Sequence, residues 1–205
     1  MAEQRPPDGP IGGQMNAIVL GLARRLRVTY LIERYSSTFV MGWFALINGV
    51  LSIGVMAAAA WATGSPFIFP SLGPTAFLFF YTPTAASAAP RNTIFGHFIG
   101  AAAGYLSLVL FDLTDAAPAF ETGVSGARIG AAALSLGLTS GLMVWFRVPH
   151  PPAGATTLIV SLGILRTPSQ LAVLMLAVVL LTVQGYVINR LAGIDYPPWR
   201  PRPQP

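Results

Sequence analysis

The sequence predicts an all-α integral membrane protein, and three observations carry that prediction. Of the 205 residues, 54% are hydrophobic and only 9% are charged, whereas a soluble domain carries about 25% charged residues. Four apolar stretches are each long enough to cross about 30 Å of hydrocarbon. The stretches are continuous rather than alternating, which argues against a transmembrane barrel.

The first 36 residues precede the apolar stretches. Residues 1–13 are rich in proline and glycine, lack the apolar core of a cleaved signal, and are expected to form a disordered tail. Within residues 14–36, apolar side chains recur every four positions with arginines between them. This pattern indicates an amphipathic helix at an anionic membrane surface. A basic linker that positions the first span is the alternative.

Four long and two short segments follow. The long ones cover residues 39–63, 92–113, 126–146 and 170–191, and the short ones cover 72–82 and 153–165. A proline-rich entry, "FPSLGP" or "VPHPPAG", precedes each short segment. Both are too short for an ordinary span, so each is either re-entrant or completes a crossing with an extended stretch. Residues 192–205 form a tail rich in proline and arginine.

Arginine placement separates the two topologies. If both short segments cross, most arginines fall on one side and the acidic residues Asp112, Asp115 and Glu121 fall on the other, with Arg128 and Arg166 as exceptions. The positive-inside rule then favours about six membrane segments with both termini cytoplasmic. The expected location is the inner (plasma) membrane of a bacterium.

An internal repeat relates the two halves of this region, residues 39–113 and 122–191. A shift of 81 residues aligns Pro70 with Pro151, Gly73 with Gly154 and Thr75 with Thr156, and it also aligns Gly104 with Gly185. With three crossings in each half, the halves would have opposite orientations, as in many transporters. The two short segments would then enter from opposite faces and meet near the middle of the membrane.

The two broken segments offer the parts of an anion site. Prolines at positions 70, 74, 151 and 152 end an extended entry and begin a short helix. Backbone N–H groups at such a helix end are expected to be free, and the end carries about half a positive charge. We expect a substrate anion to contact Ser71, Leu72, Gly73, Thr75, Ala153, Gly154, Ala155, Thr156 and Thr157. Gly154 is expected to allow close approach, and prolines that merely shorten two helices are the structural alternative.

Polar residues elsewhere in the spans are further candidates. His97 lies inside a long segment, where polar groups are functional candidates by default. His150 lies at the second proline break, and Arg91 and Asn92 begin the segment that contains His97. The alternatives are an interhelical hydrogen bond for His97, a local backbone hydrogen bond for His150 and a topology anchor for Arg91. Gly154 and Thr156, which have repeat partners, are stronger candidates than His150.

Two motifs in order, "PRNTIFGH" and "HPPAGATT", resemble the HPP family of integral membrane proteins, as does "PSLGPTAFLFFYTPTAASAAPRN". The resemblance covers about residues 39–191. Plastid and cyanobacterial members are associated with nitrite transport, so it implies a transporter of small anions. It places Arg91, Asn92, His97 and residues 150–157 on family motif positions. Where many members read glycine-alanine-serine, this chain has Leu72-Gly73-Pro74-Thr75.

Three functions are therefore weighed. The first is a transporter or channel for small monovalent anions, most of all nitrite. The second, a membrane enzyme with a histidine-dependent site, is disfavoured because the chain has no cysteine and two histidines. The third is a structural or assembly subunit whose small-residue faces serve helix packing. We expect no enzyme activity, metal, cofactor or nucleic acid, and the small-residue faces are compatible with a homo-oligomer.

Overall fold

The computed structural model describes residues 27–202, and that part of the chain forms helices without strands. Its principal helices are α2 (Val28–Ile32), α3 (Ser37–Thr63), α4 (Leu72–Tyr81), α5 (Pro90–Leu110), α6 (Ala119–Thr122), α7 (Gly126–Trp145), α8 (Ala153–Ser161) and α9 (Pro168–Leu191). The expected tail at 1–13 and most of the expected interfacial helix at 14–36 lie outside the described residues. This architecture confirms the all-α membrane fold class.

The four long helices α3, α5, α7 and α9 are long and apolar enough to cross a membrane. They agree with the four predicted long segments to within three residues at either end. Proline begins α5 and α9, where a missing N–H costs nothing. A capping box of Thr167 and Gln170 fixes the start of α9. Many large apolar side chains remain exposed on these helices, as expected where lipid takes the place of water.

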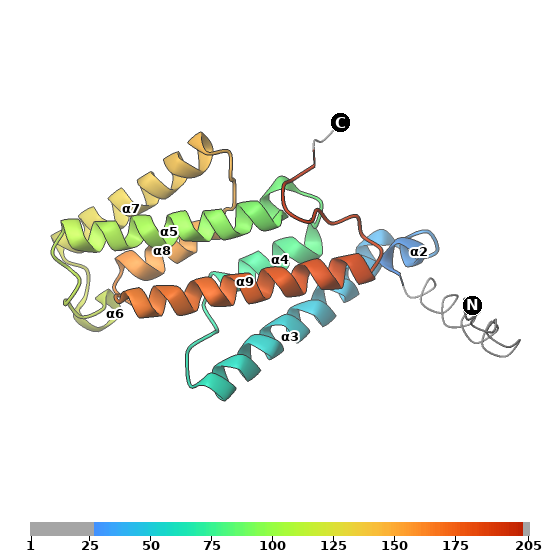
Figure 1. Ribbon diagram of the computed structural model, residues 1–205, viewed down its shortest axis with the longest axis horizontal. Helices are drawn as coiled ribbons and strands as arrows, with labels where there is room; N and C mark the ends of the chain where they lie inside the picture. The colour runs from blue at the N-terminus through green and yellow to red at the C-terminus, as the bar shows by residue number, and fades with distance from the viewer. Residues whose placement is uncertain (1–26, 203–205) are drawn as a thin grey trace, which may run out of the picture.

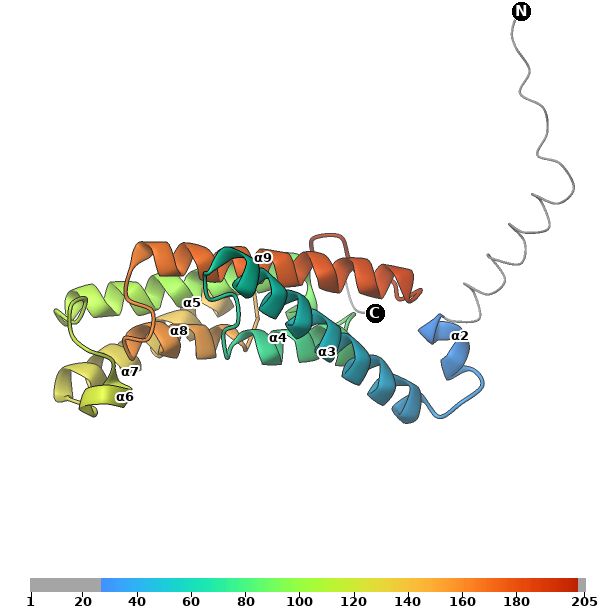
Figure 2. The ribbon, with the colours of Figure 1, turned by 90° about the horizontal axis from the view of Figure 1, so that it is seen from below.

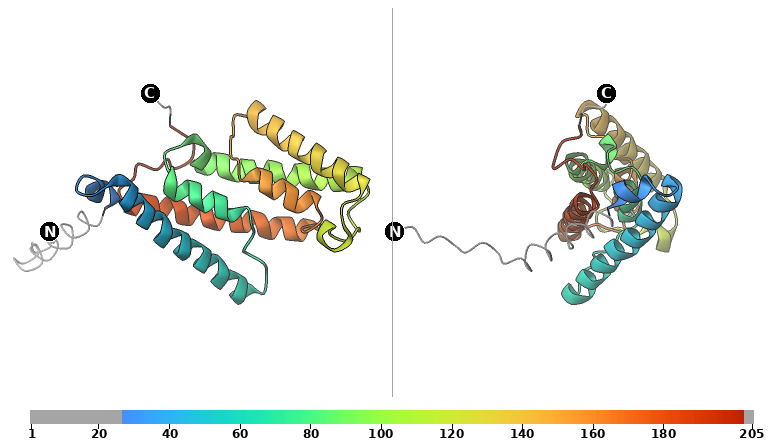
Figure 3. Two further views of the ribbon diagram at one scale, coloured as in Figure 1. Left: turned by 180° about the vertical axis from the view of Figure 1, so that it is seen from behind. Right: turned by 90° about the vertical axis from the view of Figure 1, so that its right-hand side faces the viewer.

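The two short segments are the helices α4 and α8, which lie between the long ones (Figure 1). In Figures 1 and 3 the two helices point in opposite directions, and their N-terminal ends face each other near the middle of the bundle. Residues 64–71 and 146–152 reach these ends as mainly non-helical connections. Successive helices alternate in direction along the long axis, so α3, α5 and α8 run one way and α4, α7 and α9 run the other.

Helix bounds recur with the 81-residue shift noted in the sequence. The shift carries α4 onto residues 153–162 and α5 onto 171–191, close to α8 and α9. Packing recurs as well. A Cβ at Gly104 of α5 would lie 2.7 Å from the Val160 side chain of α8, and one at Gly185 of α9 would lie 2.5 Å from the Phe79 ring of α4. Both members of the second pair are the 81-residue counterparts of the first, so each short helix packs on the last long helix of the other half.

The described end of the chain, residues 192–202, folds back over the start of α5. We call this segment the strap. Tyr196 is fully buried within it and donates its phenol O–H to the carbonyl of Ala88. Burial also raises the pKa of the Tyr196 phenol above its ordinary value. Farther along, the Trp199 carbonyl accepts a hydrogen bond from the Arg91 backbone N–H, 3.0 Å away. The tail predicted from composition is thus a packed element over this range.

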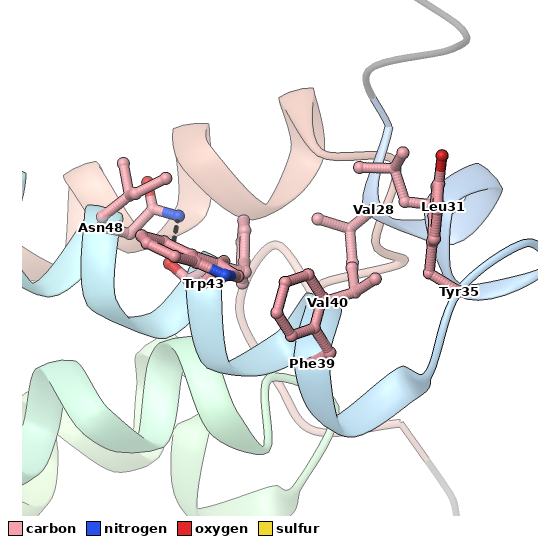
Figure 4. Close-up of a pocket in the computed structure, with 9 residues that line it drawn as sticks. Val28, Leu31, Tyr35, Phe39, Val40, Trp43 and Asn48 are labelled. Atoms are coloured by element: carbon pink, nitrogen blue, oxygen red, sulfur yellow. Dashed lines mark hydrogen bonds between the residues drawn. The ribbon is translucent and has the colours of Figure 1, made fainter.

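Helix α3 leans away from the bundle (Figures 2 and 3), and its first turns form a groove with α2 (Figure 4). α2 itself adjoins the strap, because the Val28 N–H donates to the Ala192 carbonyl at 3.0 Å. The groove has a volume of about 440 Å³ and is lined by Val28 and Leu31 of α2, by Tyr35, and by six residues of α3. None of the described residues that line it is charged. We name it the α2–α3 groove.

Candidate functional site

His97 is the centre of a buried polar cluster. It lies on the second turn of α5, and its side chain is fully buried. Its Nδ1 atom lies 2.7 Å from the hydroxyl of Thr156 on α8, and its Nε2 atom lies 2.9 Å from the hydroxyl of Thr75 on α4. These threonines occupy equivalent positions in the first turns of the two short helices. A single imidazole therefore joins both broken helices.

His150 completes the cluster from the stretch that enters α8. It is also fully buried, and its ring centroid lies 4.8 Å from that of His97. The two Nε2 atoms are 3.1 Å apart, and His150 Nε2 is also 3.2 Å from the Thr75 hydroxyl. Its Nδ1 atom lies 2.7 Å from the carbonyl oxygen of Ser87. Prolines on either side of His150 hold the chain in the turn that aims the ring inward.

Proton positions in this cluster follow from the acceptors. A carbonyl oxygen only accepts, so His150 Nδ1 carries a hydrogen and donates to Ser87. In a neutral imidazole the other nitrogen then accepts, and a tautomer of His97 with its hydrogen on Nε2 supplies a donor to it. His97 Nδ1 consequently accepts from Thr156, while Thr75 donates to the Ser71 carbonyl at 2.9 Å. Two neutral imidazoles satisfy the whole network.

The helix-end amides differ from the sequence prediction. The N–H groups of Ala153, Gly154 and Ala155 were expected to be free. They donate instead to the carbonyls of residues 150–152, at 2.9, 2.9 and 3.1 Å. The reason is local, since residues 150–152 form a turn whose carbonyls point forward into the new helix. In α4, the Leu72 N–H likewise donates to the Phe69 carbonyl at 2.9 Å. The N–H groups of Ser71 and Gly73 have no backbone acceptor among residues 27–202, so the prediction is wrong for α8 and for Leu72 but not for these two.

Close approach also occurs elsewhere than predicted. A Cβ at Gly154 would make only an ordinary contact, 3.5 Å from Leu136, and one at Gly73 would meet open space. The tight positions are on α5. A Cβ would lie 2.6 Å from His150 at Gly96 and 2.6 Å from the Ala153 carbonyl oxygen at Gly100. These glycines, one turn apart, bring α5 against α8 and so bring His97 against Thr156.

The remaining predicted residues fall into three groups. Ser71, Leu72 and Ala153 are buried beside the cluster, and the Ser71 hydroxyl has no hydrogen-bond partner among residues 27–202. Thr157 is buried on α8, where it accepts a hydrogen bond at 2.9 Å from Thr139. The third group is exposed or partly exposed and consists of Pro70, Gly73, Pro74, Pro151, Gly154 and Ala155. Pro152, the remaining predicted residue, is buried.

Arg91 and Asn92 lie apart from the histidines, at the start of α5. The Arg91 guanidinium donates to the carbonyls of Arg147 and Phe146, at 3.2 and 3.4 Å, and so caps the end of α7. Asn92 is buried and donates to the Ala86 carbonyl at 2.8 Å. In this conformation both residues hold backbone segments together.

Three buried residues that the sequence did not mark as site candidates make polar contacts in or near the cluster or at the end of α8. Thr93, whose hydroxyl is 3.5 Å from His150 Nδ1, precedes His97 by one helical turn, a spacing that could have signalled it. Thr139 reaches the cluster only through Thr157. Arg128 is 2% exposed and donates to the carbonyls of Ser161, Ala116 and Ala117. No local pattern distinguishes it from an exposed arginine.

Comparison with known proteins adds a family. Residues 34–197 match the family model described as "HPP, transmembrane region". A transmembrane protein of Dictyostelium discoideum is 32% identical over 123 residues, which are 60% of this chain and 40% of that protein. The matched region thus spans less than half the length of this relative. No solved structure matches.

Proposed function

Because the chain belongs to the HPP family of transmembrane proteins, we propose that it is a transporter or channel for small monovalent anions, with nitrite as its first candidate substrate. The observation that carries the proposal is the buried meeting of two broken helices at His97 and His150. A polar cluster at that depth is costly in a membrane protein and is a functional candidate by default. Non-helical backbone there is tolerated only where protein buries it or it lines a water-filled cavity.

The protonation pattern indicates how an anion would bind. A second proton on His150 Nε2 would place two N–H groups against each other across 3.1 Å. The rings would then have to separate, because neither nitrogen retains a lone pair to accept. A small anion between them would accept from both N–H groups, and the facing N-termini of α4 and α8 would add favourable partial charge. The anion and one proton would therefore bind together as a neutral pair.

The same proposal covers the wider architecture. We propose that α4 and α8 complete crossings, so that the halves form an inverted repeat with both termini cytoplasmic in a bacterial inner membrane. The charges support this orientation. The start of α5 and the end of α9 lie at the strap end and carry Arg91 and Arg190, with Asp195 in the strap itself. The connection from α5 to α7 lies at the other end and carries Asp112, Asp115 and Glu121, with Arg128 and Arg166 as the exceptions. The cluster contains no carboxylate or thiol, and we propose transport without a chemical reaction. Assembly as a homo-oligomer remains a prediction.

Uptake by proteoliposomes tests the function. The purified protein is reconstituted, and entry of nitrite, nitrate, formate and chloride is measured against empty liposomes, with and without an inward proton gradient. We expect nitrite uptake that an inward proton gradient accelerates, together with net movement of protons into the lumen. Uptake without proton movement would retain the anion path and reject the coupling. The absence of uptake for all four anions would reject the function.

A further inference from the structure

A groove outside the polar cluster has the lining of a ligand-binding site. It lies between the first turns of α5 and the stretch that leaves α7, has a volume of about 390 Å³, and is lined by Arg91, Phe95, Phe98, Ile99, Phe146 and Val148. We name it the Arg91 groove. It runs along nine residues of α5, 91–99, or about 12 Å of helix. Phe95 and Phe98 are about half exposed at its sides, and Ile99 and Val148 are buried at its floor.

The apolar part of the groove faces the bilayer. Phe98 is 57% exposed on a helix that spans the membrane, so lipid chains surround it. An empty groove of this size would forfeit dispersion contacts along its walls, and water would find few polar partners there. An acyl chain is the occupant that the surroundings supply and that the lining fits.

The mouth of the groove is cationic. Arg91 is the one charged residue that lines it within residues 27–202. The bonds that the Arg91 guanidinium donates to the Arg147 and Phe146 carbonyls and to the Asn92 amide oxygen are long, at 3.2 to 3.4 Å. Arg147 stands between the lining residues Phe146 and Val148. Its side chain is exposed and makes no hydrogen bond to residues 27–202. The Arg147 carbonyl lies 3.2 Å from the Arg91 guanidinium, so a second positive charge is carried by the residue next to the first. This charge at the end of an apolar channel matches a phosphate above an acyl chain, because basic pockets at the ends of membrane helices bind anionic headgroups.

The α2–α3 groove provides the contrast. It is apolar and of similar size, and none of the described residues that line it is charged (Figure 4). Arg27 and Arg34 adjoin its lining residues Val28 and Tyr35 in the sequence without lining the groove themselves. A charged side chain in the lining itself therefore distinguishes the Arg91 groove.

From these contacts we propose that the Arg91 groove binds one anionic phospholipid, with the phosphate at Arg91 and Arg147 and an acyl chain along Phe95, Phe98 and Ile99. This lipid touches the helical turn next to His97, and it touches Val148, two residues before His150. It thus joins α5 to the entry of α8, the two segments whose histidines meet in the cluster. The proposal concerns lipid binding and does not depend on which substrate is transported.

Native mass spectrometry of the full chain tests the site, with phosphatidylglycerol and phosphatidylcholine titrated separately in detergent. We expect the first phosphatidylglycerol to bind more tightly than phosphatidylcholine. Removal of the charge in Arg147→Gln should weaken phosphatidylglycerol binding about five-fold and leave phosphatidylcholine unchanged. Truncation of the channel wall in Phe98→Ala should weaken both lipids.

Matched variants control these results. Arg34→Gln removes an exposed arginine at the same end, and Phe77→Ala truncates a ring that is 56% exposed outside the groove. Neither should change lipid binding, and circular dichroism checks that each variant is folded. The proposal is overturned if both lipids bind equally, if Arg34→Gln weakens binding as much as Arg147→Gln, or if inorganic phosphate displaces the lipid. Displacement by nitrite would assign the groove to substrate entry and would also overturn it.

Discussion

His97 is the residue that contacts both broken helices, α4 and α8. Its two ring nitrogens reach Thr75 and Thr156, and its Nε2 hydrogen faces His150. Such a ring is costly to place at membrane depth unless every polar atom has a partner. Here the partners come from three different segments, so the ring position reports directly on how these segments are arranged.

Replacement of His97 should separate transport from folding. In His97→Gln the ring that bridges α4 and α8 is lost, and we expect nitrite uptake to fall to the level of empty liposomes. The control is Ser107→Ala on the same helix, because the buried Ser107 hydroxyl bonds only to the Ala103 carbonyl of its own helix. Both proteins should elute as folded material. Normal uptake by His97→Gln would remove this histidine from the transport site.

Thr156 should matter through its hydroxyl alone. Thr156→Val leaves His97 Nδ1 buried without a donor, which costs about 1–3 kcal/mol of folding stability. Thr156→Ser keeps the donor and should recover most of that loss. Thermal unfolding in detergent measures both. If serine and valine destabilise equally, packing of the methyl group, rather than the hydrogen bond, is what Thr156 contributes.

At the scale of elements, the α5–α8 contact positions the cluster. Gly96, Gly100 and Gly104 recur every four residues and form the face of α5 on which α8 lies. Close backbone approach of this kind is typical where helices associate in membranes. The small-residue faces predicted from the sequence therefore include a true packing face, and its partner is a short helix of the same chain.

Gly100 provides the sharpest test of that contact. A Cβ there would lie 2.6 Å from the Ala153 carbonyl oxygen, so Gly100→Ala must displace α8 and should cost about 1–3 kcal/mol of folding stability. Gly137→Ala on α7 is the control, since its Cβ meets nothing within 4 Å. Thermal unfolding should show a loss for the first variant only. Equal stability of the two would mean that α5 and α8 are farther apart than the structure places them.

The strap is a second element whose role can be measured. Tyr196→Phe removes the hydrogen bond to the Ala88 carbonyl and keeps the ring contacts with Phe79 and Tyr186, whose centroids lie 6.1 and 6.2 Å away. We expect a loss of about 1–3 kcal/mol in the free energy of unfolding. Tyr35→Phe, at an exposed tyrosine, serves as the comparison. An unchanged unfolding midpoint for Tyr196→Phe would show that the ring packing alone holds the strap.

At the scale of the whole molecule, labelling of single cysteines tests whether α4 crosses the membrane. The chain contains no cysteine, so single cysteines can be added and labelled from either side. If α4 crosses, Thr84→Cys lies on the same side as Arg200→Cys. Thr63→Cys and Glu121→Cys then lie on the opposite side. Labelling of Thr84→Cys together with Thr63→Cys from outside would instead make α4 re-entrant. All four positions are exposed in the structure.

The sequence by itself determined the membrane class, the four long helices and the two proline-broken short ones. These properties are local. The length of an apolar run and the position of a proline decide where a helix begins and ends, whatever it packs against. The starts of α4 at Leu72 and α8 at Ala153 could be read from the chain for this reason.

Only the tertiary structure decided which polar groups meet. His97 and His150 are 53 residues apart, and their contact depends on the glycine face of α5, on the turn before α8 and on the Ser87 carbonyl. The sequence favoured Gly154 and the helix-end amides, because a helix end in isolation has free N–H groups. In the folded chain the turn before α8 supplies acceptors for the amides of residues 153–155, and the imidazoles and the threonine hydroxyls form the buried cluster. Which atoms remain available to a substrate is a property of packing, so it could be found only after the helices were placed together.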